Sequence, residues 1–129
     1  MIKIKKYKHS KELMILLAPY ALNKEVHKEL GYPIFSSINH TWYLLFKDEI
    51  LIGFCSAINK NNNISFNHAF IDKNFRGKGY YKKLFNERYN DYKNEYIKVV
   101  ATNKSKNVFI NNNFKILKTT KNYTWLCNR

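Results

Sequence analysis

Residues 64–92 read ISFNHAFIDKNFRGKGYYKKLFNERYNDY and combine two periodicities around one turn that contains two glycines. Before the turn, residues alternate with period two, which predicts a strand with both faces at least partly covered. After the turn, aromatic and aliphatic residues recur at helical spacing, which predicts a helix that begins at the glycines. A strand, a turn and a helix therefore stand at the centre of the predicted fold.

The turn has the properties of an anion site. Gly77 and Gly79 lack a Cβ, so the backbone can adopt positive φ and an anion can approach its N–H groups closely. The unpaired amides of the helix N-terminus and the charges of Arg76 and Lys78 would complete a site for a phosphate or pyrophosphate. From these residues alone, a plain strand-to-helix turn with a basic flank is an equally good interpretation.

Two well-known phosphate loops do not match this turn. A Walker loop needs four residues between its first glycine and a Gly-Lys-Ser/Thr tripeptide, and the chain has no such spacing. A Rossmann fingerprint needs three glycines that open the first crossover and an acidic residue about twenty positions later. Here the glycines come late in the chain and the third one is missing. Neither nucleotide-binding fold is supported.

The stretch resembles motif A of the GCN5-related N-acetyltransferases, the GNAT superfamily. In that family a strand and a short loop lead to Arg/Gln-x-x-Gly-x-Gly/Ala and then a helix. Here the motif reads Arg76-Gly77-Lys78-Gly79-Tyr80-Tyr81, with Tyr81 where the family usually has Gly or Ala. The resemblance implies that the amides of this loop bind the pyrophosphate of acetyl-CoA. It also implies that the preceding strand offers backbone groups at Phe70 and Ile71 to the pantetheine arm.

The length of 129 residues predicts one domain, residues 1–129, with a single core. No apolar run approaches the roughly 18 to 20 residues that span a bilayer, and the first ten residues lack the apolar core of a signal peptide. We therefore expect a soluble, cytoplasmic protein. Cys55 and Cys127 lie far apart in apolar segments, which predicts buried thiols and no metal site.

The rest of the chain supplies further strands and helices on both sides of the central unit. Strands are predicted near residues 2–7, 41–46, 50–58, 96–101, 114–117 and 123–126, and helices near 11–20, 24–30 and within 103–113. Three consecutive antiparallel strands would precede the turn, and strand 96–101, reached by a helical crossover, would lie parallel to strand 64–71. This order also resembles the GNAT acyl-CoA N-acyltransferase fold, which is α/β (α+β) with a mixed sheet of about seven strands flanked by about four helices.

A second local match follows strand 96–101. There the family commonly has an asparagine, a short helix with a tyrosine, and Gly-Phe, and this chain has Asn103, Phe109 and Asn113-Phe114. The resemblance implies that Asn103 contacts the pantetheine arm and that Phe109 takes the place of the tyrosine that often protonates the CoA thiolate. Phe109 has no proton to give. Three alternatives stay open: another residue serves, positioning alone suffices, or acetyl transfer has been lost.

His68 is the candidate general base. Its ordinary pKa near 6.5 suits proton transfer at neutral pH, and in the family this strand borders the acceptor site. The alternative is a histidine packed among Phe66 and Phe70.

The charge balance is strongly basic, with 23 Lys and Arg against 9 Asp and Glu and a formal net charge of +14. Such a field attracts nucleic acid, anionic surfaces and the phosphates of a cofactor. Nearly all the basic residues are lysines in an asparagine-rich chain, however, which also fits an AT-rich coding sequence.

We expect an acetyl-CoA-dependent N-acetyltransferase that acts on an amine of an acceptor that the sequence does not identify. One alternative is a nucleic-acid-modifying protein on the same fold that resembles phage Mom-type base modifiers. Another is a non-catalytic binding protein, of phage type for example, whose groove is blocked by Tyr80 or Tyr81. Small proteins of this fold often pair, so a monomer and a homodimer both stay open.

Overall fold

The central unit consists of β4 (Asn63–Ile71), a short 3-10 helix η1 (Lys73–Phe75) and α3 (Tyr80–Tyr92). The computed structural model describes residues 1–129. The strand, the glycine turn and the helix lie where the two periodicities predict them. η1 is an addition, and the side chain of Asp72 begins it by accepting a hydrogen bond from the Asn74 N–H at 3.0 Å.

Six further strands and three further helices follow the predicted order. They are β1 (Ile2–Lys8), α1 (Lys11–Ala21), α2 (Lys24–Leu30), β2 (His40–Lys47), β3 (Ile50–Lys60), β5 (Ile97–Thr102), α4 (Lys106–Ile110), β6 (Lys115–Thr119) and β7 (Tyr123–Cys127). Ser10 and Asn23 cap the N-termini of α1 and α2 through their side-chain oxygens, and Gly31 ends α2 at φ +89°. None of the helices is long and apolar enough to cross a membrane.

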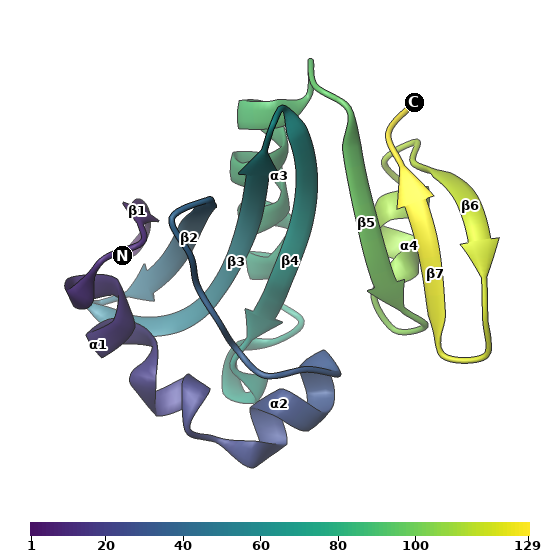
Figure 1. Cartoon of the computed structure of the whole chain (residues 1–129). Coiled ribbons are helices and arrows are strands. Elements are labelled where there is room, and N and C mark those ends of the chain that lie inside the picture. The colour runs from purple at the N-terminus through teal and green to yellow at the C-terminus, as the bar shows by residue number, and fades with distance from the viewer.

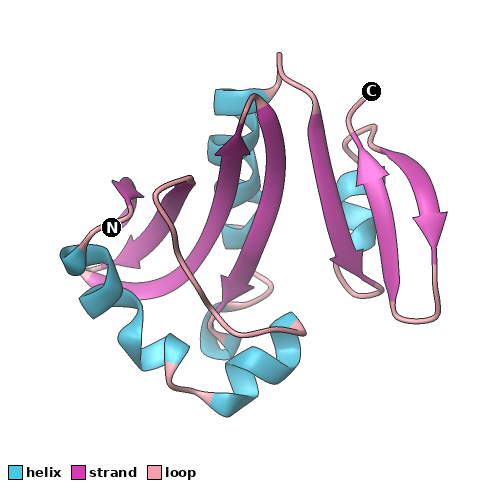
Figure 2. Ribbon diagram, in the orientation of Figure 1, coloured by secondary structure: helices cyan, strands magenta, loops and turns pink.

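The strands form one mixed sheet in the order β1-β2-β3-β4-β5-β7-β6. β4 and β5 are parallel, and β2, β3 and β4 are consecutive antiparallel strands, both as predicted. The other neighbours, β1 with β2, β5 with β7 and β6 with β7, are antiparallel as well. Helices α1 and α2 cover one face of the sheet, and α3 and α4 cover the other (Figures 1 and 2). Buried apolar side chains fill both layers, with Leu17 and Trp42 in the first and Phe85 and Phe109 in the second.

β4 and β5 pair only over Ile64–Phe66 and Ile97–Val99 and then separate, so the sheet opens between them (Figure 1). An irregularity in β4 accompanies the separation. Phe54 and Ser56 of β3 lie opposite Phe70 and Asn67, so β4 has one extra residue in this interval. His68 lies there with φ +46°, a conformation that non-glycine residues seldom adopt. The bulge and the short pairing together position the site.

Candidate active site

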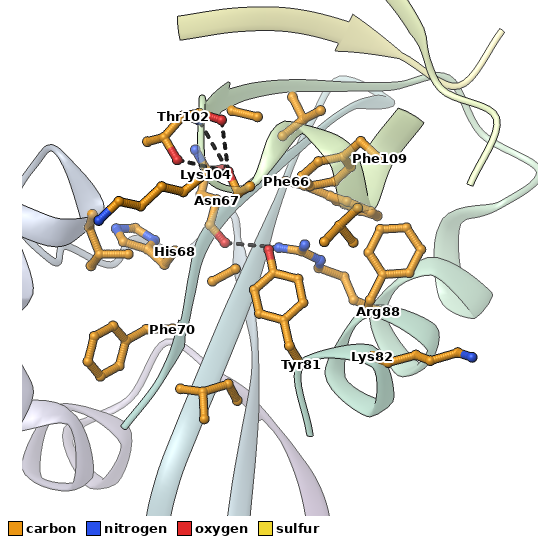
Figure 3. A pocket seen from close by; sticks show the side chains of 18 of the residues that line it. Phe66, Asn67, His68, Phe70, Tyr81, Lys82, Arg88, Thr102, Lys104 and Phe109 are labelled. Carbon is orange, nitrogen blue, oxygen red and sulfur yellow. Dashed lines mark hydrogen bonds between the residues drawn. The ribbon is translucent and has the colours of Figure 1, made fainter. Parts of the chain in front are cut away.

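A cleft of about 820 Å³ begins where β4 and β5 separate and extends to the glycine turn. Figure 3 shows side chains of β4, of α3 and of the segment from β5 to α4 turned toward it. Slightly more than half of the lining residues are hydrophobic, a composition typical of small-molecule sites. Of the predicted site residues, the cleft is lined by His68, Phe70, Ile71, Arg76, Gly77, Gly79, Tyr80, Tyr81 and Phe109, whereas Lys78 and Asn103 are not among its lining residues.

The glycine turn presents free backbone amides at one end of this cleft. Gly77 and Gly79 have φ of +77° and +82°, and an added Cβ would meet nothing within 4 Å at either position. No side chain caps α3, and the Lys83 N–H donates to the Gly79 carbonyl at 3.2 Å. The amides of the preceding first-turn residues, Tyr80 to Lys82, therefore have no intrahelical acceptor. An anion can approach them closely.

Arg76 holds the turn in place. Its Nε donates to the Ile71 carbonyl at 2.8 Å, and its two terminal nitrogens lie 2.6 and 2.7 Å from the carboxylate oxygens of Glu29. The guanidinium thus joins the end of β4 to α2, and Glu29 compensates its charge. Since both side chains are about one-third exposed or more, this pair contributes at most about 1 kcal/mol to stability.

Two lysines add positive charge to the lining of the cleft. Lys78 is exposed, with its Nζ 5.9 Å from the centre of the Phe75 ring. Lys82 in the first turn of α3 and Lys104 before α4 line the cleft instead. Sequence reasoning missed this role, although the place of Lys82 in the first helical turn after the glycines could have indicated it.

A family model described as an acetyltransferase (GNAT) domain matches residues 9–126. The chain belongs to the GNAT acetyltransferase family. Solved structures share its fold at low identity. Escherichia coli ElaA is 12% identical over 100% of both chains, with a TM-score of 0.77. An acetyltransferase from Thermus thermophilus is 14% identical over 97% of this chain and 96% of its own, with a TM-score of 0.73.

The PaiA N-acetyltransferase from Thermoplasma acidophilum was solved in complex with coenzyme A. It is 14% identical over 100% of this chain and 99% of its own, with a TM-score of 0.68. None of the curated protein sequences matches this one. The predicted GNAT resemblance and the predicted mixed sheet are both confirmed.

The GNAT tyrosine position is apolar in this member of the family. Phe109 is 3% exposed and packs edge-on against Phe85 and Phe114, with ring centres 5.6 and 5.3 Å apart. Asn103 is exposed, and its Nδ2 donates to the Lys121 carbonyl at 3.0 Å. This placement gives no support to the predicted pantetheine contact of Asn103.

His68 lies at the bulge and is 1% exposed. Its ring stacks on Trp42 with centres 4.8 Å apart, its Nδ1 lies 2.8 Å from Ser56 Oγ, and its Nε2 lies 3.5 Å from the Phe35 nitrogen. Burial lowers its pKa to about 3, so the imidazole is neutral at pH 7 and a weak base. The packed-histidine alternative fits this environment, although its neighbours include Trp42 and Tyr32.

Sequence reasoning also missed a polar cluster in the cleft, which we call the Arg88 cluster and define as Asn67, Tyr81 and Arg88. Arg88 is 1% exposed, and its Nη1 donates to the carbonyls of Ser56 and Asn67 at 2.9 and 3.0 Å. Figure 3 shows Arg88 and Tyr81 extending from α3 toward Asn67. One indication was available, because Tyr81, Leu84 and Arg88 share a helical stripe that is otherwise apolar.

Proposed function

We propose that the protein transfers an acetyl group from acetyl-CoA to an amine of an acceptor. The observation that carries this proposal is the uncapped first turn of α3 at Gly79, which opens onto a cleft bordered by the unpaired part of β4. Free amides suit a pyrophosphate, and a strand without a neighbour on one side suits an extended amide-containing chain.

The residues present fit the cofactor of this family. The amides after Gly77 and Gly79 would hold the pyrophosphate, helped by the charges of Lys82 and Lys104. The backbone of β4 near Phe70 and Ile71 would hold the pantetheine arm, which we retain from the sequence analysis as a prediction. Bound acetyl-CoA supplies the acetyl group as an activated thioester.

The chain's own contribution is mainly positioning. An acceptor amine must be neutral to attack, and its proton must leave. The pKa of about 3 makes His68 a poor acceptor for that proton, so we assign the proton to water and not to His68. A β4 amide near Ile71 would polarise the acetyl carbonyl. Fixing the two reactants in a productive geometry can supply several kcal/mol by itself.

Calorimetric titration of acetyl-CoA and CoA tests this proposal. We expect micromolar binding to the wild type, and loss of binding in Gly79→Glu, because a carboxylate would enter the anion site. Thr119→Glu on the exposed strand β6 is the matched control, since it changes the net charge by the same amount at a distance from the cleft. Equal binding by all three proteins, or no binding, would contradict the proposal. Binding justifies a screen of amines for CoA release.

The cleft volume bears on the non-catalytic alternative. Tyr80 and Tyr81 line the cleft, yet about 820 Å³ remains open. The two side chains leave room for a ligand in the cleft, which supports cofactor binding. A blocked groove would instead have favoured a non-catalytic binding protein.

A further inference from the structure

Arg88 is a buried cation without an anionic partner. The ion pairs of the protein join Met1 to Asp48, Lys6 to Asp91 and Arg76 to Glu29, and Arg88 belongs to none of them. Its only hydrogen bonds go to two backbone carbonyls, through Nη1. Buried charges are normally paired, because removing them from water is costly.

The titratable groups that face Arg88 are all neutral at pH 7. They come from every element around it and are Tyr32 after α2, Cys55 of β3, His68 of β4 and Tyr81 of α3. Burial raises the pKa of the two tyrosines and the cysteine, and it lowers the pKa of His68. The protein itself therefore supplies no negative charge to this guanidinium.

Unsatisfied polar atoms gather at the same place. Six buried side-chain atoms in the chain lack a hydrogen-bond partner, and three of them belong to the Arg88 cluster, namely Asn67 Oδ1, Tyr81 OH and Arg88 Nε. Arg88 Nε is a donor, Tyr81 OH can donate or accept, and Asn67 Oδ1 is an acceptor. The Arg88 guanidinium also lies over the Phe66 ring, 4.1 Å from its centre, but this contact brings no ionised partner. Since native proteins leave few buried polar groups unpaired, a free donor beside a cation without an anionic partner in the cleft lining indicates an anionic ligand.

We propose that Arg88 and Tyr81 bind a negative charge at the reacting end of the acyl-CoA. They would serve in place of the family's tyrosine, whose position Phe109 occupies without a hydroxyl group. This inference rests on the proposed function. During transfer the amine nitrogen bonds to the carbonyl carbon, the carbon–sulfur bond breaks with its electron pair on sulfur, and the amine proton leaves to water. The negative charge has one of two sources. It belongs either to this thiolate or to a carboxylate at the end of a longer acyl chain.

Titration of three ligands between pH 6 and pH 9 distinguishes the sources. A thiolate site lowers the pKa of the bound thiol, so CoA binds up to about tenfold tighter per unit of rising pH until the ordinary thiol pKa of about 8.5, and acetyl-CoA does not follow. A carboxylate site makes succinyl-CoA bind about 10-fold to 100-fold tighter than acetyl-CoA at pH 7. Either result supports the proposal.

Variants locate the effect. Tyr81→Phe removes a hydroxyl that has no partner, so the fold is unaffected and the preference for the anionic ligand falls. Arg88→Gln abolishes the preference, and Arg88→Lys restores part of it because the charge remains. Tyr89→Phe, on α3 but outside the cleft lining, is the matched control.

Two outcomes would overturn the inference. If acetyl-CoA binds through the Gly79 turn but neither anionic ligand gains affinity, the Arg88 proposal is wrong and the proposed function stands. The same holds if a gain is present and survives in both Tyr81→Phe and Arg88→Gln. If none of the three ligands binds, both proposals fail together.

Discussion

At the residue scale, burial makes His68 a much weaker base than a histidine in water. The imidazole packs against the rings of Trp42, Tyr32 and Phe35, where a positive charge has little solvation. Its pKa of about 3 lies well below its ordinary value, so folding selects the neutral ring. The residue therefore links stability to pH.

The sign of this linkage is definite. Between pH 6.5 and about 3 the unfolded chain protonates His68 and the folded protein does not, so stability falls as pH falls through this window. We expect His68 to contribute a slope of up to about 1.4 kcal/mol per pH unit. Urea unfolding at pH 4.5, 5.5 and 6.5 measures it. His68→Gln should flatten the slope, and the exposed His9→Gln should keep it. An unchanged slope in His68→Gln would show that the ring is protonated when folded.

Residue types and spacing revealed part of the site. The glycines and their flanking charges indicated the turn, since backbone conformation and helix ends depend on local sequence. The environment of Arg88 and the exposure of Asn103 depend on which strands lie nearby, and no local pattern encodes that. Arg76 shows the same limit, because its partner Glu29 lies 47 positions away.

At the element scale, the contact between β3 and β4 depends on a glycine without a side chain. An added Cβ at Gly53 would lie 2.6 Å from Ile71 Cδ1 and 2.9 Å from the Phe70 carbonyl oxygen. The Ile71 methyl can move, whereas the carbonyl belongs to the sheet. The two strands approach each other closely here, next to the bulge that shapes the cleft.

We expect Gly53→Ala to lower the free energy of unfolding by about 1 to 3 kcal/mol through this overpacking. Ile71→Val should cost about 0.5 to 1.5 kcal/mol. The double variant should lose less stability than the two single variants lose together, because the shortened Ile71 side chain removes the 2.6 Å contact. Denaturant unfolding of the four proteins completes the cycle, and strictly additive costs would argue against the close approach.

The element order was predictable because helical and strand periods alternate clearly along the chain. The separation of β4 from β5 was not. It depends on a bulge at a histidine with positive φ, a conformation that histidine, like asparagine and aspartate, adopts more often than most residues but still seldom, so the residue type alone does not predict it. It also depends on Arg88, which supplies hydrogen-bond donors to the carbonyls of Ser56 and Asn67 at the bulge.

At the scale of the whole molecule, the net charge of +14 comes from lysines spread over most strands and helices. Only Lys82 and Lys104 among them line the cleft. Lysines dispersed over many elements attract polyanions without selecting among them.

We therefore expect weak, sequence-independent binding to duplex DNA, with dissociation constants of about 10⁻⁴ to 10⁻⁶ M at physiological salt and a steep loss of affinity at higher salt. Fluorescence anisotropy with two unrelated labelled duplexes over a salt series measures this. Sub-micromolar affinity for one duplex that persists at physiological salt would instead favour the nucleic-acid-modifying alternative.

The three residue pairs between β4 and β5 also have a mechanical meaning. They make a seam between a four-stranded N-terminal half and a three-stranded C-terminal half, and the aromatic cluster of Phe85, Phe109 and Phe114 ties the halves together on one face. A molecule bound in the cleft would contact both halves, since residues of β4 and of β5 line it. Because a ligand stabilises the state that binds it, such a ligand would make the two halves unfold more cooperatively and would slow local opening of the C-terminal half.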